Sequence, residues 1–282
     1  MILVTGATGN VGSEIARQLV AAGKPFRIYV RDGAKAAQMI GPGEYETMLG
    51  DFGDEAAFAA ALEGVESVFM VTNQSDEFMQ DLKRMAGQVE RSDVRRFVML
   101  SAENDPASEI YFLRRTGELE QIVEATGVPW TFIRPDWFMQ NFIGLAASGM
   151  VIFPNDPGKT SFVDVRDVAE IATKLLTEDG HVHRSYRVTG PEAFTFKGAT
   201  QRIGETLGRD IPFAPITREQ MHAALLDAGY EQWNADMNSE MTKVLEPGLN
   251  FSPSNDIEFL IGRKPRSIES FAADHAAMFG GN

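Results

Sequence analysis

Residues 1–12 read MILVTGATGNVG, and they carry the strongest indication of the fold. Residues 1–5 form an apolar run rich in strand-forming residues, and Val11, Ile15 and Leu19 then recur at helical spacing. The pattern predicts a buried strand, a glycine-rich turn and a helix. Such a turn presents the backbone N–H groups of the helix N-terminus. These donors and the helix dipole favour an anion, most simply a dinucleotide pyrophosphate.

The glycines of this turn have separate expected roles. Gly6 permits the tight turn, Gly9 lets a phosphate approach a backbone without Cβ, and Gly12 lets the helix pack closely on the strand. Their spacing is G-x-x-G-x-x-G rather than the commoner G-x-G-x-x-G, and ordinary turns also collect glycine. The strand before the turn and the helix after it are the context in which the motif predicts a nucleotide site.

The composition is typical of a soluble globular protein, and 282 residues suffice for one large or two modest domains. A formal net charge of -14 repels phosphate backbones and anionic lipid, so we expect neither nucleic acid nor a membrane as a partner. Cysteine is absent, and the histidines lack partners at metal-ligand spacing, so no metal site is expected. No apolar run is long enough to span a membrane and no leader precedes the first strand, which predicts a cytoplasmic protein.

Strands and helices alternate from the first turn to residue 135. Further strands are predicted at 26–30, 45–49, 65–71, 97–100 and 130–133. Alternation of this kind predicts an α/β fold with a doubly wound parallel sheet, a Rossmann domain. The later part of the chain is mostly helical. We therefore expect a dinucleotide-binding Rossmann domain over residues 1–180 and a smaller, mainly helical substrate-binding or cap part over 181–282, with elements of 150–180 open to either assignment.

The second predicted strand ends in Arg31 and Asp32, about twenty residues past the glycine turn. In dinucleotide-binding folds, a residue at this position contacts the ribose of the cofactor. An acidic residue there binds the hydroxyls of NAD, whereas a basic one suits the 2′-phosphate of NADP. Arg31 stands at the strand tip and Lys35 follows one helical turn later, so two cations converge there. The alternatives are a ribose contact by Asp32, or charges that are merely solvated.

Two other strand ends carry candidate residues. Asp51 and Phe52 follow the third predicted strand, at the edge where cofactors bind in such sheets. Asp51 either accepts from an adenine amino group, with Phe52 beside the ring, or caps the helix that follows. Ser101 ends the fifth predicted strand, where it either hydrogen-bonds a substrate oxygen or caps the next helix.

Several stretches together carry a family resemblance. They are TGATGNVG at 5–12, VRDGAK at 30–35, GDFGD at 50–54, GVPWTFIRP at 127–135 with FMQN at 138–141, and DVRDVA at 164–169. In combination they resemble the NmrA-like family of atypical short-chain dehydrogenases/reductases. That family includes NADPH-dependent quinone oxidoreductases, triphenylmethane dye reductases and redox-sensing regulators.

The resemblance implies NADP(H) as the cofactor and assigns its contacts. The implied contacts are, for the pyrophosphate, Gly6, Thr8, Gly9, Asn10 and Val11; for the 2′-phosphate, Arg31 and Lys35; for the adenine, Asp51 and Phe52; for the ribose, Thr72 and Asn73; and for the nicotinamide, Pro135 with Asp136, Trp137 and Phe138. Aromatic and methionine residues around Trp137 and Phe138 either line a pocket for a flat apolar substrate or belong to the core of a buried helix.

The catalytic pair that the resemblance implies fits this chain less well. Short-chain dehydrogenases use Tyr-x-x-x-Lys, in which Tyr supplies a proton while Lys lowers its pKa and holds the ribose. Tyr111 and Arg115 have that spacing, but aligning the following helix moves the two positions to Phe112 and Thr116. The two registers exclude each other, because one residue rotates a helical side chain by about 100°. Tyr111 and Ser101 are the candidate catalytic residues.

The leading hypothesis is an NADPH-dependent reductase that transfers hydride to a quinone or another flat conjugated acceptor. Such an acceptor needs little proton help, because the oxyanion that forms is delocalised. A ketone or alkene reductase of a biosynthetic pathway is an alternative that requires Tyr111 or Ser101 as a donor. A nonenzymatic NADP(H) sensor is another, since fold analogy does not exclude it. The sequence leaves open whether the chain forms a homodimer.

Overall fold

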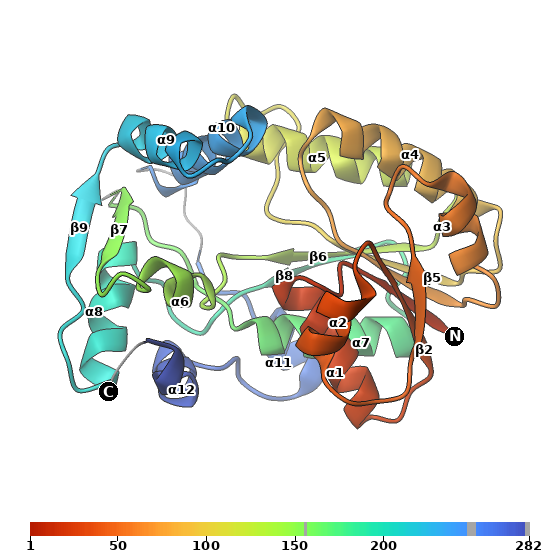
Figure 1. Cartoon of the computed structure of the whole chain (residues 1–282), viewed down its shortest axis with the longest axis horizontal. Coiled ribbons are helices and arrows are strands. Elements are labelled where there is room, and N and C mark those ends of the chain that lie inside the picture. The colour runs from red at the N-terminus through yellow and green to blue at the C-terminus, as the bar shows by residue number, and fades with distance from the viewer. Residues whose placement is uncertain (155–156, 247–251, 280–282) are drawn as a thin grey trace. The chain divides into compact units, whose positions relative to one another are not determined.

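The computed structural model describes residues 1–154, 157–246 and 252–279, and the chain divides into two compact units (Figure 1). Unit 1 comprises Met1–Pro106, Arg115–Arg134 and Val165–Arg187. Unit 2 comprises Ala107–Arg114, Pro135–Asp164 and Val188–Asn282. This division differs from the single boundary expected near residue 180, because the chain passes between the units several times.

Unit 1 is built on a seven-stranded sheet of order β3-β2-β1-β4-β5-β6-β8. The pairs from β3 to β6 are parallel, so the predicted Rossmann architecture is confirmed. The order reverses between β1 and β4, which is where ligands bind in such sheets. The strands are β1 (Ile2–Thr5), β2 (Phe26–Val30), β3 (Glu46–Leu49), β4 (Ser67–Met70), β5 (Arg96–Leu100), β6 (Trp130–Pro135) and β8 (Arg184–Val188).

The central strands are apolar because helices cover both faces of the sheet. Every residue of β1 and β4 is buried, whereas the edge strand β3 leaves Leu49 62% exposed. Figure 1 shows α3 and α4 on one face of the sheet, with α1 and α7 packed together on the other. The helices with all or most of their residues in unit 1 are α1 (Asn10–Ala21), α2 (Gly33–Ile40), α3 (Glu55–Ala61), α4 (Asp76–Glu90), α5 (Tyr111–Glu124) and α7 (Val165–Thr177).

Helix α7 explains why residues 165–187 belong to unit 1. Its buried face, which includes Val168, Ile171 and Leu175, packs against α1. The strand β8 that follows then joins the edge of the large sheet. Residues 135–164 instead contribute to the core of unit 2 through Phe142, Phe153 and other aromatic side chains.

Unit 2 is mainly helical around an aromatic core. The rings of Phe153 and Phe196 stack with centroids 3.9 Å apart, and Phe162 packs edge-on to Phe196 and to Phe142. A two-stranded parallel sheet joins β7 (Val151–Pro154) to β9 (Phe213–Ile216). The remaining elements are α6 (Asn141–Leu145), α8 (Phe196–Thr206), α9 (Arg218–Asp227), α10 (Gln232–Met241), η1 (Thr242–Leu245), α11 (Asp256–Ile261), α12 (Ile268–Asp274) and η2 (Ala276–Phe279). Among the described residues, no helix has the length and apolar character needed to cross a membrane.

Candidate functional site

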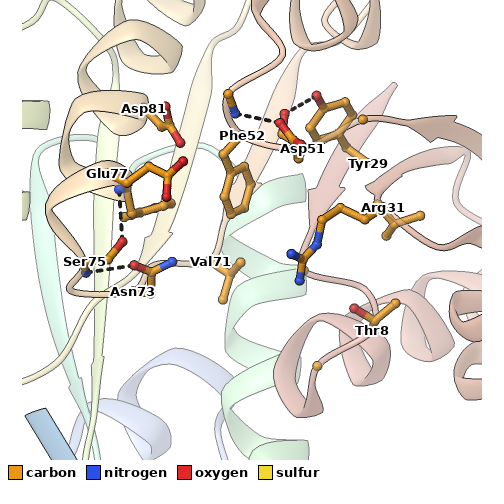
Figure 2. Close-up of a pocket in the computed structure, with 16 residues that line it drawn as sticks. Thr8, Tyr29, Arg31, Asp51, Phe52, Val71, Asn73, Ser75, Glu77 and Asp81 are labelled. Atoms are coloured by element: carbon orange, nitrogen blue, oxygen red, sulfur yellow. Dashed lines mark hydrogen bonds between the residues drawn. The ribbon is translucent and has the colours of Figure 1, made fainter. Parts of the chain in front are cut away.

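A pocket of about 440 Å³ lies within unit 1, at the carboxyl ends of β1, β2, β3 and β4 (Figure 2). It brings together several residues that the sequence predicts as cofactor contacts: Gly6, Thr8, Gly9, Arg31, Asp51, Phe52 and Asn73. The other residues that line it are Tyr29, Val30, Gly50, Gly53, Val71, Ser75, Glu77, Phe78 and Asp81. The remaining predicted contacts are not among the lining residues; they are Asn10, Val11, Lys35, Thr72, Pro135, Asp136, Trp137 and Phe138.

The glycine turn is shaped by the fold at two of its three glycines. Gly6 has φ +66°, and a Cβ on it would lie 2.5 Å from a methyl carbon of Val71. A Cβ on Gly12 would lie 2.3 Å from the carbonyl oxygen of Gly6, so α1 packs on the turn only with glycine there. A Cβ on Gly9 would lie 3.3 Å from that same oxygen, in an ordinary backbone conformation. The fold alone therefore demands glycine at Gly6 and Gly12 much more than at Gly9.

Helix α1 begins differently from its neighbours. The side chains of Asp32, Asp54 and Ser75 accept hydrogen bonds from the first turns of α2, α3 and α4, respectively. The N-cap of α1 is Gly9, and no side chain in the described parts of the chain caps it. The first N–H groups of α1 are thus left for a ligand, and an anion is the partner that they and the helix dipole favour.

The end of β2 places a cation at the pocket. Arg31 lines the pocket, and Figure 2 shows its guanidinium group pointing into the pocket, on the same side as Thr8. Asp32 has another task, because its carboxylate accepts from the backbone N–H of Lys35 at 2.9 Å and caps α2. Binding of a ribose by Asp32, the alternative role, would have to use the same carboxylate that makes this hydrogen bond.

The loop after β3 forms the opposite wall. Asp51 accepts from the backbone N–H of Gly53 at 2.9 Å, so its carboxylate orders its own turn. The cap of α3 is Asp54, which excludes the alternative that Asp51 caps that helix. Phe52 lies edge-on to Phe78 of α4, with ring centroids 5.2 Å apart. An aromatic wall and a carboxylate therefore stand together at this end of the pocket.

The loop after β4 is held by side chains at both ends. Thr72 donates to the carbonyl oxygen of Leu100 at 2.7 Å and so ties the end of β4 to β5. Asn73 accepts from the backbone N–H of Ser75 at 2.9 Å, while Ser75 accepts from that of Phe78 at 3.1 Å. Asn73 lines the pocket as a result, and Thr72 instead serves the strand pairing.

Ser101 belongs to a buried network that neither sequence alternative includes. Its hydroxyl donates to a carboxylate oxygen of Glu120 at 2.6 Å, and Glu120 is 4% exposed. Arg134 at the end of β6 donates to the same carboxylate at 2.9 Å. Burial works against the charge of Arg134, but the hydrogen bond and charge of Glu120 raise its pKa above the ordinary value. Ser101 lies ten residues before the first residue of α5, and the hydrogen bond that its hydroxyl donates joins β5 to α5 rather than capping that helix.

Arg115 forms ion pairs that a Lys-like catalytic role does not require. Its guanidinium group bonds Asp76 at 2.5 Å and Glu118 at 3.0 Å, and it also donates to the carbonyl oxygen of Gln74. These contacts attach α5 to the start of α4. Tyr111, four residues earlier, lies in unit 2 with the guanidinium of Arg114 5.7 Å from its ring centre.

The aromatic residues after β6 also lie in unit 2. Met139 and Phe142 are core residues, with 1% and 0% exposure. Trp137 is half-buried and edge-on to Phe153 and Phe196. The core interpretation therefore holds for Met139 and Phe142, while the substrate contacts of Trp137 and Phe138 stay predictions.

Sequence reasoning missed several lining residues, among them Tyr29, Glu77 and Asp81. A signal for two of them was present, since Glu77 and Asp81 are four residues apart in the helix that follows β4. Figure 2 shows their carboxylates on the α4 side of Phe52. Tyr29 lies inside β2, where a strand pattern indicates only burial.

The comparisons with known proteins match most of the chain. A family described as NAD(P)H-binding matches residues 6–179. The chain belongs to this NAD(P)H-binding family. It is 34% identical to NAD(P)H azoreductase of Xenophilus azovorans, with 99% of each chain covered. It is 38% identical to (4-alkanoyl-5-oxo-2,5-dihydrofuran-3-yl)methyl phosphate reductase of Streptomyces griseus subsp. griseus, again with 99% of each covered.

The NADPH complex of an NADPH-dependent quinone oxidoreductase from Escherichia coli has a similar fold. The TM-score is 0.82 at 23% sequence identity, with 97% of this chain and 99% of that chain covered. The predicted family resemblance is confirmed. This member of the NAD(P)H-binding family is an NAD(P)H-dependent oxidoreductase.

Proposed function

We propose that the chain reduces a quinone or a similar flat conjugated acceptor by hydride transfer from NADPH. The observation that carries the proposal is the pocket of unit 1, which has phosphate-binding features at one end and base-binding features at the other. Its uncapped helix N-terminus and Arg31 suit phosphates, whereas Phe52 and Asp51 suit an aromatic base with an amino group.

The residues present fit a dinucleotide. The N–H groups at the start of α1, with Thr8 and Gly9, would hold the pyrophosphate, and Gly9 leaves the space that a Cβ would fill. Arg31 would bind the 2′-phosphate, and Asp32 is engaged as a helix cap rather than offered to a ribose. Asp51 would accept from the adenine amino group. These assignments favour NADPH over NADH.

The relatives suggest the class of acceptor. An azo group, a quinone and a 5-oxo-2,5-dihydrofuran with an alkanoyl substituent each contain an electron-poor conjugated double bond. Hydride addition to such a bond leaves an anion whose charge is spread over the conjugated system. An acceptor of this class is therefore reducible without a strong acid at the reacting atom.

NADPH, when bound, supplies the hydride, and the acceptor takes up that hydride and one proton. Two candidate side chains of unit 1, Ser101 and Arg115, are engaged elsewhere in the protein. The hydroxyl of Ser101 donates to Glu120, and Arg115 is held by Asp76 and Glu118. We assign the proton to solvent water, and the protein's contribution to holding the two rings in near-attack geometry, an effect that can reach about 7–11 kcal/mol.

Reduction of a conjugated C=C bond in a biosynthetic pathway is the second candidate function. The 38% identity to the dihydrofuranyl methyl phosphate reductase favours it. That reaction would use the same cofactor pocket with a different acceptor.

The test is a screen of NADPH oxidation, followed at 340 nm, over quinones, azo dyes, triarylmethane dyes and conjugated lactones. Steady turnover with a quinone or azo dye is the expected result. Turnover with conjugated lactones alone supports the second candidate. Tight NADPH binding by calorimetry without turnover on any acceptor refutes both and leaves the NADP(H) sensor.

A further inference from the structure

We infer that Tyr29 is a positioning residue: it holds in place the loop of residues 50–53, and this loop binds the adenine half of the cofactor. This inference rests on the proposed binding of NADPH in the pocket of unit 1. Tyr29 lines that pocket, but its hydroxyl group is directed at the loop (Figure 2). The residues that would contact the base, Asp51 and Phe52, belong to this loop.

The side chain of Tyr29 is held firmly. The residue is 2% exposed, and its ring packs edge-on against Phe58 of α3, with centroids 5.5 Å apart. Its hydroxyl donates to the backbone carbonyl oxygen of Asp51 at 2.6 Å. Because packing against Phe58 locks the ring, the hydrogen bond transmits that rigidity to the loop after β3.

Gly50 matches Tyr29 from the other side of the contact. A Cβ on Gly50 would lie 2.3 Å from the hydroxyl oxygen of Tyr29 and 2.7 Å from its ring. The backbone N–H of Gly50 also donates to the carbonyl oxygen of Val30 at 3.1 Å. The loop thus leaves β3 in direct contact with the Tyr29 ring, with no room for a side chain between them.

Asp51 is consequently fixed at three points. Its backbone carbonyl oxygen accepts from the hydroxyl of Tyr29 and from the backbone N–H of Asp54 at 3.1 Å, and its own carboxylate accepts from the N–H of Gly53 through one oxygen. The other carboxylate oxygen is the one that would accept from the adenine amino group. A loop already fixed in this way pays little ordering entropy when the base binds.

The hydrogen bond persists over the working pH range. Burial, together with the nearby charges of Asp54 and Asp51, raises the pKa of Tyr29 to about 12. The hydroxyl therefore keeps its proton at neutral and mildly alkaline pH, and the positioning effect is expected to be constant between pH 6 and about 9, well below that pKa.

The test uses Tyr29→Phe, which removes the hydroxyl and keeps the ring against Phe58. Calorimetry measures the binding of adenosine 2′,5′-bisphosphate, which contains only the adenine half of NADPH with its 2′-phosphate. We expect binding about three- to tenfold weaker, the effect of one neutral hydrogen bond. On the best acceptor, the KM for NADPH is expected to rise by a similar factor while kcat stays unchanged. Tyr45→Phe is the matched control, since Tyr45 stacks on Phe26 and does not line the pocket.

Gly50→Ala tests the same contact independently, because its methyl group displaces the Tyr29 hydroxyl. We expect it to weaken the bisphosphate similarly, and the double variant to lose less than the product of the two factors. Should Tyr29→Phe fail to fold in a melting experiment, Gly50→Ala carries the test. Unchanged bisphosphate binding in either folded variant, or a fall in kcat with unchanged KM, overturns the inference. Absence of bisphosphate binding to the unaltered protein instead refutes the proposed cofactor pocket itself.

Discussion

Replacing Arg31 with alanine should weaken the binding of NADPH and leave that of NADH nearly unchanged. Among the described residues that line the pocket, Arg31 is the only cation, and it shares the pocket with the carboxylates of Asp51, Glu77 and Asp81. A dianionic 2′-phosphate bound there would lose its one attractive charge in Arg31→Ala. NADH carries no 2′-phosphate, so its affinity should change little.

The magnitude follows from the exposure of the arginine. A charge-assisted hydrogen bond contributes about 1.5–3 kcal/mol, which corresponds to roughly ten- to a hundredfold in affinity. Arg31 is exposed, and solvent and salt screen an exposed charge, so the lower end of that range applies. We expect NADPH to bind Arg31→Ala about tenfold more weakly at low salt and the difference to shrink at high salt.

Calorimetry with both cofactors at two salt concentrations measures this difference. Arg31→Lys should recover part of the loss, because it restores the charge but not the planar fork. Arg91→Ala is the matched control, since Arg91 is exposed at the far end of α4, away from the pocket. Equal losses for NADPH and NADH would refute the assignment, because they would show that Arg31 serves the loop rather than the phosphate.

Three further predictions follow from individual contacts. Gly9→Ala should stay folded and bind NADPH at least tenfold more weakly by calorimetry. Gly12→Ala should instead lower the melting temperature, because its Cβ would lie 2.3 Å from a carbonyl oxygen. An unchanged NADPH affinity in Gly9→Ala would refute the proposal that this turn binds the pyrophosphate. Tyr111→Phe and Ser101→Ala should each lower kcat less than about tenfold on the best acceptor, below the range of general acid catalysis; a hundredfold fall for Tyr111→Phe would restore a tyrosine-dependent mechanism. Burial lowers the pKa of His181, so the unfolded chain binds a proton at higher pH than the folded chain does. The stability that the neutral His181 contributes is therefore present above about pH 6.5 and is lost as the pH falls through the lower pKa of the folded state. Melting temperatures should therefore fall more on acidification in the unaltered protein than in His181→Gln, and parallel pH profiles would contradict this.

The core of the fold and the class of cofactor can be predicted from local patterns in the sequence. The first strand, the glycine turn and α1 lie within about twenty consecutive residues, so the hydrophobic period and the glycine spacing encode them locally. The same holds for Arg31, which directly follows β2, and for Asp51 and Phe52, which follow β3. In a parallel sheet all of these strand ends meet at one edge, and the sequence therefore predicted much of the pocket.

The partners of the candidate catalytic residues depend instead on how the strands and helices pack together. Ser101 meets Glu120 and Arg134 because β5 and β6 are neighbours in the sheet and α5 connects them. Arg115 meets Asp76, 39 positions away in the sequence, and Tyr29 meets the backbone of Asp51, 22 positions away.

Such contacts depend on which strands pair and in which register, and no local pattern of residue types specifies that choice. The chain's repeated passage between the two units has the same origin: α7 joins unit 1 because its apolar face fits α1, a match that exists only once both helices are in place.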